Sequence, residues 1–268
     1  MPVTPPIGGA PAPRTAADLT RTFYAAYQDP TRTVLEGFHP VRHALRFGAT
    51  LQVAVTYAPD RLAALVTRLA PEIASPLEAA LQVVDRARFG HLSRRSLSSP
   101  LLAIADRPPD KLAVALAERT KPVVHLERPR NPGNVGAVIR VAAAAGVGAV
   151  TLSGTLDPWS PVVLRSATGL QYALPVGLAE LPEPGGRPIV AVAVDGEPVE
   201  SAELPADAIL AIGGERFGLS AEVRTRAHRV IGIPMRAGVS SLNLATAVSA
   251  VLFSWRTAAV ARSGTPPW

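Results

Sequence analysis

Short apolar runs alternate with amphipathic or alanine-rich segments along most of the chain. In the second half, the apolar runs predict strands over 122–126, 149–152, 189–194, 208–212 and 230–233. The intervening and following segments predict helices over 134–145, 162–167, 222–227 and 242–259. Short apolar strands that alternate with helices are typical of a parallel sheet buried on both faces. The second half is therefore predicted to be an α/β domain with a parallel sheet flanked by helices.

The first half predicts a smaller α/β unit over 32–106. Strands are expected over 51–57, 81–84 and 101–105, and helices over 39–47 and 61–69. Residues 1–31 are assigned to an N-terminal extension that is disordered over its proline-rich start and helical over 15–28. The turn-rich sequence at 106–110 marks a linker, which we assign to 107–120, before a second domain over 121–262.

Composition narrows the function classes. The 268 residues carry a formal net charge of +6, which favours a polyanionic partner such as nucleic acid. Apart from Lys111 and Lys121 the basic residues are Arg, beside much Ala and Pro, so a biased genome explains the charge equally well. The absence of Cys excludes disulfides and thiolate chemistry, and no metal site is predicted. No run is long enough to span a bilayer and no signal peptide is apparent, so a cytoplasmic protein with no membrane partner is expected.

Three blocks of glycine and polar residues follow predicted strands in the second half. They cover 131–140 (NPGNVGAVIR), 212–218 (IGGERFG), and 233–235 (IPM) with 240–243 (SSLN). In open α/β sheets, ligands bind at the carboxyl ends of the strands. Asn134 is expected to cap the helix that follows the first strand, while Arg140 lies among apolar residues and should need a partner. The blocks should therefore meet at one edge of the sheet.

Each block also has a purely structural interpretation. The first could be a capped helix whose Arg140 pairs with a buried carboxylate, and Gly213-Gly214 could be an ordinary turn. Capping would explain one of Ser240, Ser241 and Asn243, but not all of them. The basic cluster, defined as Arg86, Arg88, Arg94 and Arg95, could be a solvated face or a phosphate-binding surface.

Together, the blocks closely resemble the three signature motifs of the SpoU–TrmH branch of SPOUT RNA methyltransferases, over about 121–259. The sequence at 35–45 (LEGFHPVRHAL) resembles the start of the ribosomal-protein-like RNA-binding domain that often precedes this catalytic domain. The resemblance implies a deep trefoil knot near the C-terminus, S-adenosylmethionine bound in the knot, methylation of a ribose 2′-hydroxyl of RNA, and a homodimer.

The same resemblance assigns roles to residues. The expected catalytic residues are Asn134, Arg140, Glu215, Ser241 and Asn243, and the expected cofactor contacts are Gly213, Gly214, Ile233 and Leu242. Arg165 and the basic cluster are expected to contact RNA. An Arg keeps its charge, so our hypothesis is that Arg140 stabilises a developing alkoxide and orients the neighbouring phosphate, or relays the proton to it.

Several alternatives stay open. Structured ribosomal RNA is the preferred substrate, because an RNA-binding domain suits recognition of a folded site by shape and phosphate contacts, and transfer RNA is second. A catalytically silent knotted RNA-binding protein and a base methyltransferase are the competing classes. A role in antibiotic resistance is an alternative to a housekeeping role.

Overall fold

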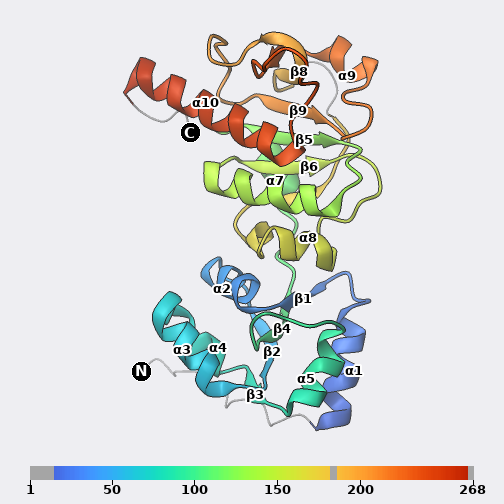
Figure 1. Cartoon of the computed structure of the whole chain (residues 1–268), viewed down its shortest axis with the longest axis vertical. Coiled ribbons are helices and arrows are strands. Elements are labelled where there is room, and N and C mark those ends of the chain that lie inside the picture. Colours follow the sequence, from blue (N-terminus) through green and yellow to red (C-terminus); the bar gives the residue numbers. More distant parts are fainter. Residues whose placement is uncertain (1–14, 182–185, 265–268) are drawn as a thin grey trace, which may run out of the picture. The chain divides into compact units, whose positions relative to one another are not determined.

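Figure 1 shows the computed structural model of the chain, which describes residues 15–181 and 186–264. The chain divides into two compact units, Met1–Pro108 and Pro109–Trp268, which are described separately below. The first fourteen residues, predicted to be disordered, lie outside the described residues. Within the described residues, no helix is both long and apolar enough to cross a membrane.

The first unit contains a four-stranded sheet with both parallel and antiparallel strand pairs, together with five α-helices in its described residues. Its helices are α1 (Ala16–Ala26), α2 (Phe38–Arg46), α3 (Pro59–Leu69), α4 (Ala74–Glu78) and α5 (Arg86–Ser93), and its strands are β1 (Arg32–Glu36), β2 (Leu51–Thr56), β3 (Leu81–Val83) and β4 (Leu102–Asp106). The strand order is β1-β4-β2-β3, with β4 antiparallel to both of its neighbours and β3 parallel to β2. Strand β1 and helices α4 and α5 are not predicted by the sequence pattern.

Helix α1 belongs to the core of this unit. Leu19, Phe23 and Ala26 follow one face of the helix and are buried with strand residues that include Val53 and Ile104. Spacings of four and three residues put such side chains on one stripe, so the helix packs rather than extends into solvent. The prediction that this helix belongs to an extension outside the 32–106 unit is therefore wrong.

The second unit contains a six-stranded parallel sheet. Its strands are β5 (Val123–Glu127), β6 (Ala149–Leu152), β7 (Val176–Leu178), β8 (Ile189–Pro198), β9 (Ile209–Gly213) and β10 (Arg229–Gly232), in the order β10-β8-β9-β5-β6-β7. Every pair of neighbouring strands is parallel. The predicted parallel sheet flanked by helices is therefore confirmed.

Helices cover both faces of this sheet. The helices are α6 (Leu112–Ala117), α7 (Pro132–Ala145), α8 (Pro161–Ser166), α9 (Ala221–Arg226) and α10 (Leu244–Ser263). Val138 of α7 and Trp255 of α10 are buried in one core with Leu126 of β5, whereas Leu112 of α6 and Val223 of α9 belong to a core on the opposite face. Because side chains alternate along a strand, β5 contributes to both cores.

The start of α7 differs from the prediction. Asn131, not Asn134, is its N-cap: the Asn131 Oδ1 accepts hydrogen bonds from the backbone N–H groups of Gly133 and Asn134, at 2.8 and 3.3 Å. Pro132 is the first helical residue, a position where a missing N–H costs nothing. The prediction that Asn134 caps the helix is therefore wrong, and its side chain is left available for other contacts.

Candidate functional site

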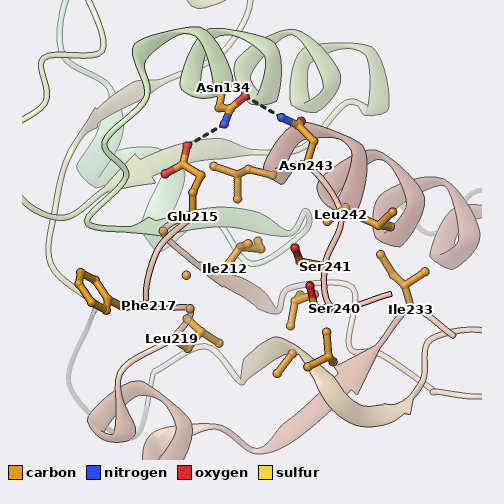
Figure 2. A pocket seen from close by; sticks show the side chains of 18 of the residues that line it. Asn134, Ile212, Glu215, Phe217, Leu219, Ile233, Ser240, Ser241, Leu242 and Asn243 are labelled. Carbon is orange, nitrogen blue, oxygen red and sulfur yellow. Dashed lines mark hydrogen bonds between the residues drawn. The ribbon is translucent and has the colours of Figure 1, made fainter. Parts of the chain in front are cut away.

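A cavity of about 560 Å³ lies at the carboxyl edge of the parallel sheet in the second unit. Figure 2 shows that it is surrounded by the loop after β9, the segment before α10 and the N-terminal end of α7. Eight of the residues predicted for the site line it: Asn134, Gly213, Gly214, Glu215, Ile233, Ser241, Leu242 and Asn243. The volume is in the usual range for a small-molecule site, roughly 300–1,000 Å³.

Three polar side chains from distant parts of the sequence form a hydrogen-bonded network at this cavity (Figure 2). The Nδ2 of Asn134 donates to the Oε1 of Glu215 at 2.7 Å, and the Nδ2 of Asn243 donates to the Oδ1 of Asn134 at 2.9 Å. The Oδ1 of Asn243 accepts the backbone N–H groups of Ala245 and Thr246, so Asn243 is the N-cap of α10. The donor and the acceptor of each hydrogen bond in this network, from the start of α10 to the Glu215 carboxylate, are therefore defined.

Glu215 is held as a carboxylate. Partial burial raises its pKa, but hydrogen bonds from the Asn134 amide and from the backbone N–H groups of Glu215, Arg130 and Asn131 outweigh burial, and the pKa lies below its ordinary value. A carboxylate that accepts several N–H groups keeps its charge at neutral pH. Glu215 therefore orients the Asn134 amide and is not suited to donate a proton.

Gly213 and Gly214 are required by the packing of their own loop. A Cβ on Gly213 would lie 1.9 Å from the carbonyl carbon of Gly218, and a Cβ on Gly214 would lie 2.9 Å from the carbonyl oxygen of Arg128. Gly214 and Gly218 also form an antiparallel bridge. The two glycines thus let the loop fold back on the strand end while their bare backbone lines the cavity.

The segment before α10 supplies the hydroxyl groups of the cavity. Ser240 and Ser241 line it together with Leu242 (Figure 2), and the cap of α10 is made by Asn243. Capping therefore explains one of these polar residues, as expected, and leaves two hydroxyls at the cavity.

The sequence predicts Ile233 and Leu242 as apolar residues of the site but gives no role to the others. Val192, Ala193 and Val194 of β8, and Phe217, Leu219, Met235 and Leu244, also line the cavity. Arg224 lines it as well, in a two-bond pair with the Asp195 carboxylate at 2.6 and 3.0 Å. Residues 192–194 lie in a predicted strand, but their place beside β9 could be found only from the order of the strands in the sheet.

Arg140 is not among the residues that line the cavity. Six residues of helix place its side chain about 9 Å along α7 and about 120° around it from Asn134. Arg140 is exposed and, among the described residues, its side chain has no hydrogen bond or ion pair. The alternative in which Arg140 pairs with a buried carboxylate is therefore wrong for the described residues. Arg165 is half-buried in α8 and also lies outside the cavity lining.

Members of the basic cluster contact partners within the first unit. The guanidinium of Arg94 stacks on Tyr27 at 3.9 Å and on Tyr24 at 4.5 Å, and that of Arg86 lies 5.4 Å from the ring centre of Tyr57. Two further ion pairs join Arg88 to Asp85 and Arg95 to Glu36, at 3.9 and 3.8 Å. These contacts fit a structural role, and the proposed contact of the cluster with RNA stays a prediction.

Comparison with known proteins links the second unit to one family. The model of the SpoU rRNA methylase family matches residues 121–253. A 23S rRNA (uridine-2′-O)-methyltransferase of Streptomyces viridochromogenes is 32% identical over 169 residues, which are 57% of this chain and 58% of that protein. An uncharacterized tRNA/rRNA methyltransferase of Mycobacterium bovis is 32% identical over 253 residues, 89% of this chain and 76% of that protein. The structure of an AdoMet-bound rRNA methyltransferase from Sinorhizobium meliloti is similar with a TM-score of 0.70 and 25% identity, over 90% of this chain and 94% of that one.

Proposed function

Because the chain belongs to the SpoU rRNA methylase family, we propose that it transfers a methyl group from S-adenosylmethionine to a ribose 2′-hydroxyl of ribosomal RNA. The observation that carries this proposal is the network of Asn243, Asn134 and Glu215 at the edge of a cavity of nucleoside size. The similarity to a 23S rRNA 2′-O-methyltransferase supports ribosomal RNA over transfer RNA. A ribosomal substrate implies that the enzyme works in the cytoplasm, which is part of the same proposal.

The residues around the cavity fit S-adenosylmethionine. Ile212, Ile233 and Leu242 offer apolar surface for a purine ring, while the bare backbone at Gly213 and the Ser241 hydroxyl offer hydrogen-bonding groups. Such a mixture of apolar walls and a few polar groups is typical of nucleoside sites. The bound cofactor supplies a methyl group on a positively charged sulfur.

Polar residues at the cavity edge would position the ribose. The Asn134 amide uses one N–H on Glu215, and its second N–H is available to the attacking hydroxyl or its neighbour. Because Glu215 and Asn243 fix this amide from both sides, it donates from one orientation without reorganising during the reaction. Orientation of this kind would direct an oxygen lone pair at the methyl carbon, so that the new C–O bond forms as the S–CH3 bond breaks. The hydroxyl proton would leave to the neighbouring phosphate or to water.

We also propose that the enzyme is a homodimer in which Arg140 acts on the site of the partner chain. Arg140 is exposed and lies on another side of α7 from the cavity, so a second copy could accept it. Its guanidinium would stabilise the negative charge that develops on the ribose oxygen. Arg140→Ala and Asn134→Ala chains should each be inactive, and their co-expression should restore activity, since one site of a mixed dimer is then intact. If a mixed dimer is shown to form but has no activity, Arg140 does not act in the site of the partner chain.

The predicted trefoil knot stays part of the proposal. Its support is the family to which the chain belongs. The paired strands β8 and β10 also approach closely beside the cavity: a Cβ on Gly196 would lie 2.2 Å from the carbonyl carbon of Ile231, and a Cβ on Gly232 would lie 2.7 Å from the Ala193 carbonyl oxygen. Only glycines permit chains to pass at such distances.

The function is tested by incubating the purified protein with methyl-labelled S-adenosylmethionine and unmodified ribosomal RNA, and then digesting the RNA to nucleosides. We expect label in 2′-O-methylated nucleosides, identified by mass spectrometry. Label on a base would support a base methyltransferase instead. No binding of S-adenosylmethionine in a calorimetric titration would support a silent RNA-binding protein.

A further inference from the structure

Three arginines lie next to residues that border the cavity or pack against its loop, and within the described residues their guanidinium groups have no hydrogen bond or ion pair. Arg128 and Arg130 follow β5, and Arg216 follows Glu215 on the loop after β9. All three are exposed. Arginines left with all their donors in solvent are suited to an external anion.

The three arginines start from backbone positions that lie together. The carbonyl oxygen of Arg128 abuts Gly214, where a Cβ would come within 2.9 Å of it. The backbone N–H of Arg130 points to the Oε2 of Glu215 at 3.5 Å, and Arg216 is the next residue after Glu215. The guanidinium groups therefore extend from the immediate surroundings of the carboxylate that orients Asn134.

The backbone of Arg128 is held in an unusual conformation. Its φ of 45° is in the left-handed region, which costs a non-glycine residue roughly 1 kcal/mol or more. The Ser153 hydroxyl accepts the Arg128 N–H at 3.0 Å, and the side chain passes over Gly154, whose Cβ would lie 3.8 Å from the Arg128 Cγ. Glycine would suit this backbone better, so the fold holds the Arg128 side chain in place at a cost in backbone strain.

Phe217 presents an aromatic ring beside these arginines. It is 81% exposed, and Figure 2 shows it at the edge of the cavity on the same loop as Glu215. The loop is fixed by the bridge between Gly214 and Gly218 and by the hydrogen bond from Asn134 to Glu215. An exposed ring on a fixed loop gives a stacking surface at little cost in entropy.

We propose that Arg128, Arg130, Arg216 and Phe217, here called the arginine rim, bind the unpaired RNA segment around the target nucleotide. The arginines contact phosphates, and Phe217 stacks on a base. This assignment rests on the proposed function, because it places single-stranded RNA next to the ribose site. Positive charge interleaved with an aromatic ring matches single-stranded nucleic acid, in which phosphates and unstacked bases alternate.

The proposal is tested with two variants and a short mixed-sequence single-stranded RNA as the probe. One variant combines Arg128→Gly, Arg130→Gln and Arg216→Gln; the glycine relieves the strained backbone and so protects the fold. The other is Phe217→Ala. Loss of three phosphate contacts should reduce the slope of log affinity against log salt by about 2. Loss of the stacking surface should weaken binding roughly 5- to 150-fold, with little change in the salt slope.

A control variant loses the same charge elsewhere in the second unit: Lys111→Gln with Arg119→Gln and Arg229→Gln, all exposed positions outside the cavity lining. It should bind the RNA nearly as the unaltered protein does. The triple arginine variant and the control should keep the affinity for S-adenosylmethionine, which confirms that the cavity is folded. Phe217 lines the cavity, so the fold of Phe217→Ala is checked by circular dichroism and denaturant unfolding instead. Unchanged RNA affinity and salt slope in the rim variants, or equal losses in the control, would overturn the proposal. These binding results are independent of catalysis, so they remain decisive even if the unaltered protein transfers no methyl group to ribosomal RNA.

Discussion

The arginines of the basic cluster and of the arginine rim are mostly exposed, but their side chains differ in what they contact. In the basic cluster, Arg94 contacts two tyrosine rings and Arg95 pairs with Glu36. In the arginine rim, the described residues offer no partner to Arg128, Arg130 or Arg216. Arginines that are already paired must lose a contact before they bind phosphate, whereas unpaired ones lose only water.

The comparison shows that closeness in sequence is a poor guide to a binding surface. The cluster is four arginines within ten residues of sequence, 86–95, a spacing that indicates a charged surface. The rim is assembled from the ends of β5 and β9, which are neighbours in the sheet although far apart in the chain. A site built by strand order can gather unpaired charge that no local run of residues reveals.

The largest expected effect comes from the polar network beside the rim. Glu215→Gln replaces a carboxylate that only accepts hydrogen bonds with an amide that also donates, so the Asn134 amide loses its fixed orientation. We expect kcat to fall about 10²- to 10³-fold, with a small change in the KM for S-adenosylmethionine. Initial rates of methyl transfer to ribosomal RNA measure both parameters.

Glu197→Gln is the matched control, because it removes the same charge from a carboxylate that pairs with Arg229 away from the cavity lining. It should leave kcat within about twofold, as expected of exposed ion pairs. A Glu215→Gln enzyme with the same kcat as this control would show that the network does not take part in the reaction. The comparison between a catalytic site in the second unit and a structural arginine cluster in the first would then no longer hold.

A fall in pH should destabilise the second unit more than the first, and this effect is smaller than that of Glu215→Gln. His125 on β5 is 2% exposed and its Nδ1 contacts the Thr151 hydroxyl at 2.9 Å. Burial lowers the pKa of His125 to about 4, with Arg226 adding to this and Glu127 opposing it. The unfolded chain takes up this proton near pH 6.5, so the second unit is fully stable above that pH and loses roughly 3 kcal/mol as the pH falls to 4.

Hydrogen exchange followed separately in the two units at pH 7 and pH 5 measures this difference. The histidines of the first unit, His39, His43 and His91, are exposed or half-buried, so its stability should change less. His125→Gln removes the titrating group and should flatten the response of the second unit. An equal response in both units, or no effect of this variant, would contradict the assignment to His125.

Much of the second unit could be predicted because its strands are short, apolar and buried on both faces. The convergence of Asn134, Glu215 and Asn243 followed from the same pattern, since parallel strands bring their carboxyl ends to one edge. The cap at Asn131 was missed because two asparagines three residues apart compete for one helix start, and only the fold shows which has the right backbone. The short strand β7 (Val176–Leu178) has too few residues to show a period.

The smallest expected effect tests whether the basic cluster is structural. Arg94→Ala removes the stacking on Tyr24 and Tyr27 and should lower the free energy of unfolding of the first unit by about 1 kcal/mol. Arg94→Gly removes the same contacts but relieves the left-handed backbone, where φ is 54°, so it should be the less destabilising of the two. Denaturant unfolding measures both changes, and RNA affinity should fall far less than in the rim variants. The opposite outcome is that Arg94→Ala weakens RNA binding as strongly as the triple rim variant and leaves stability unaltered. The basic cluster would then bind RNA, and contacts within the chain would not prevent an arginine from binding phosphate.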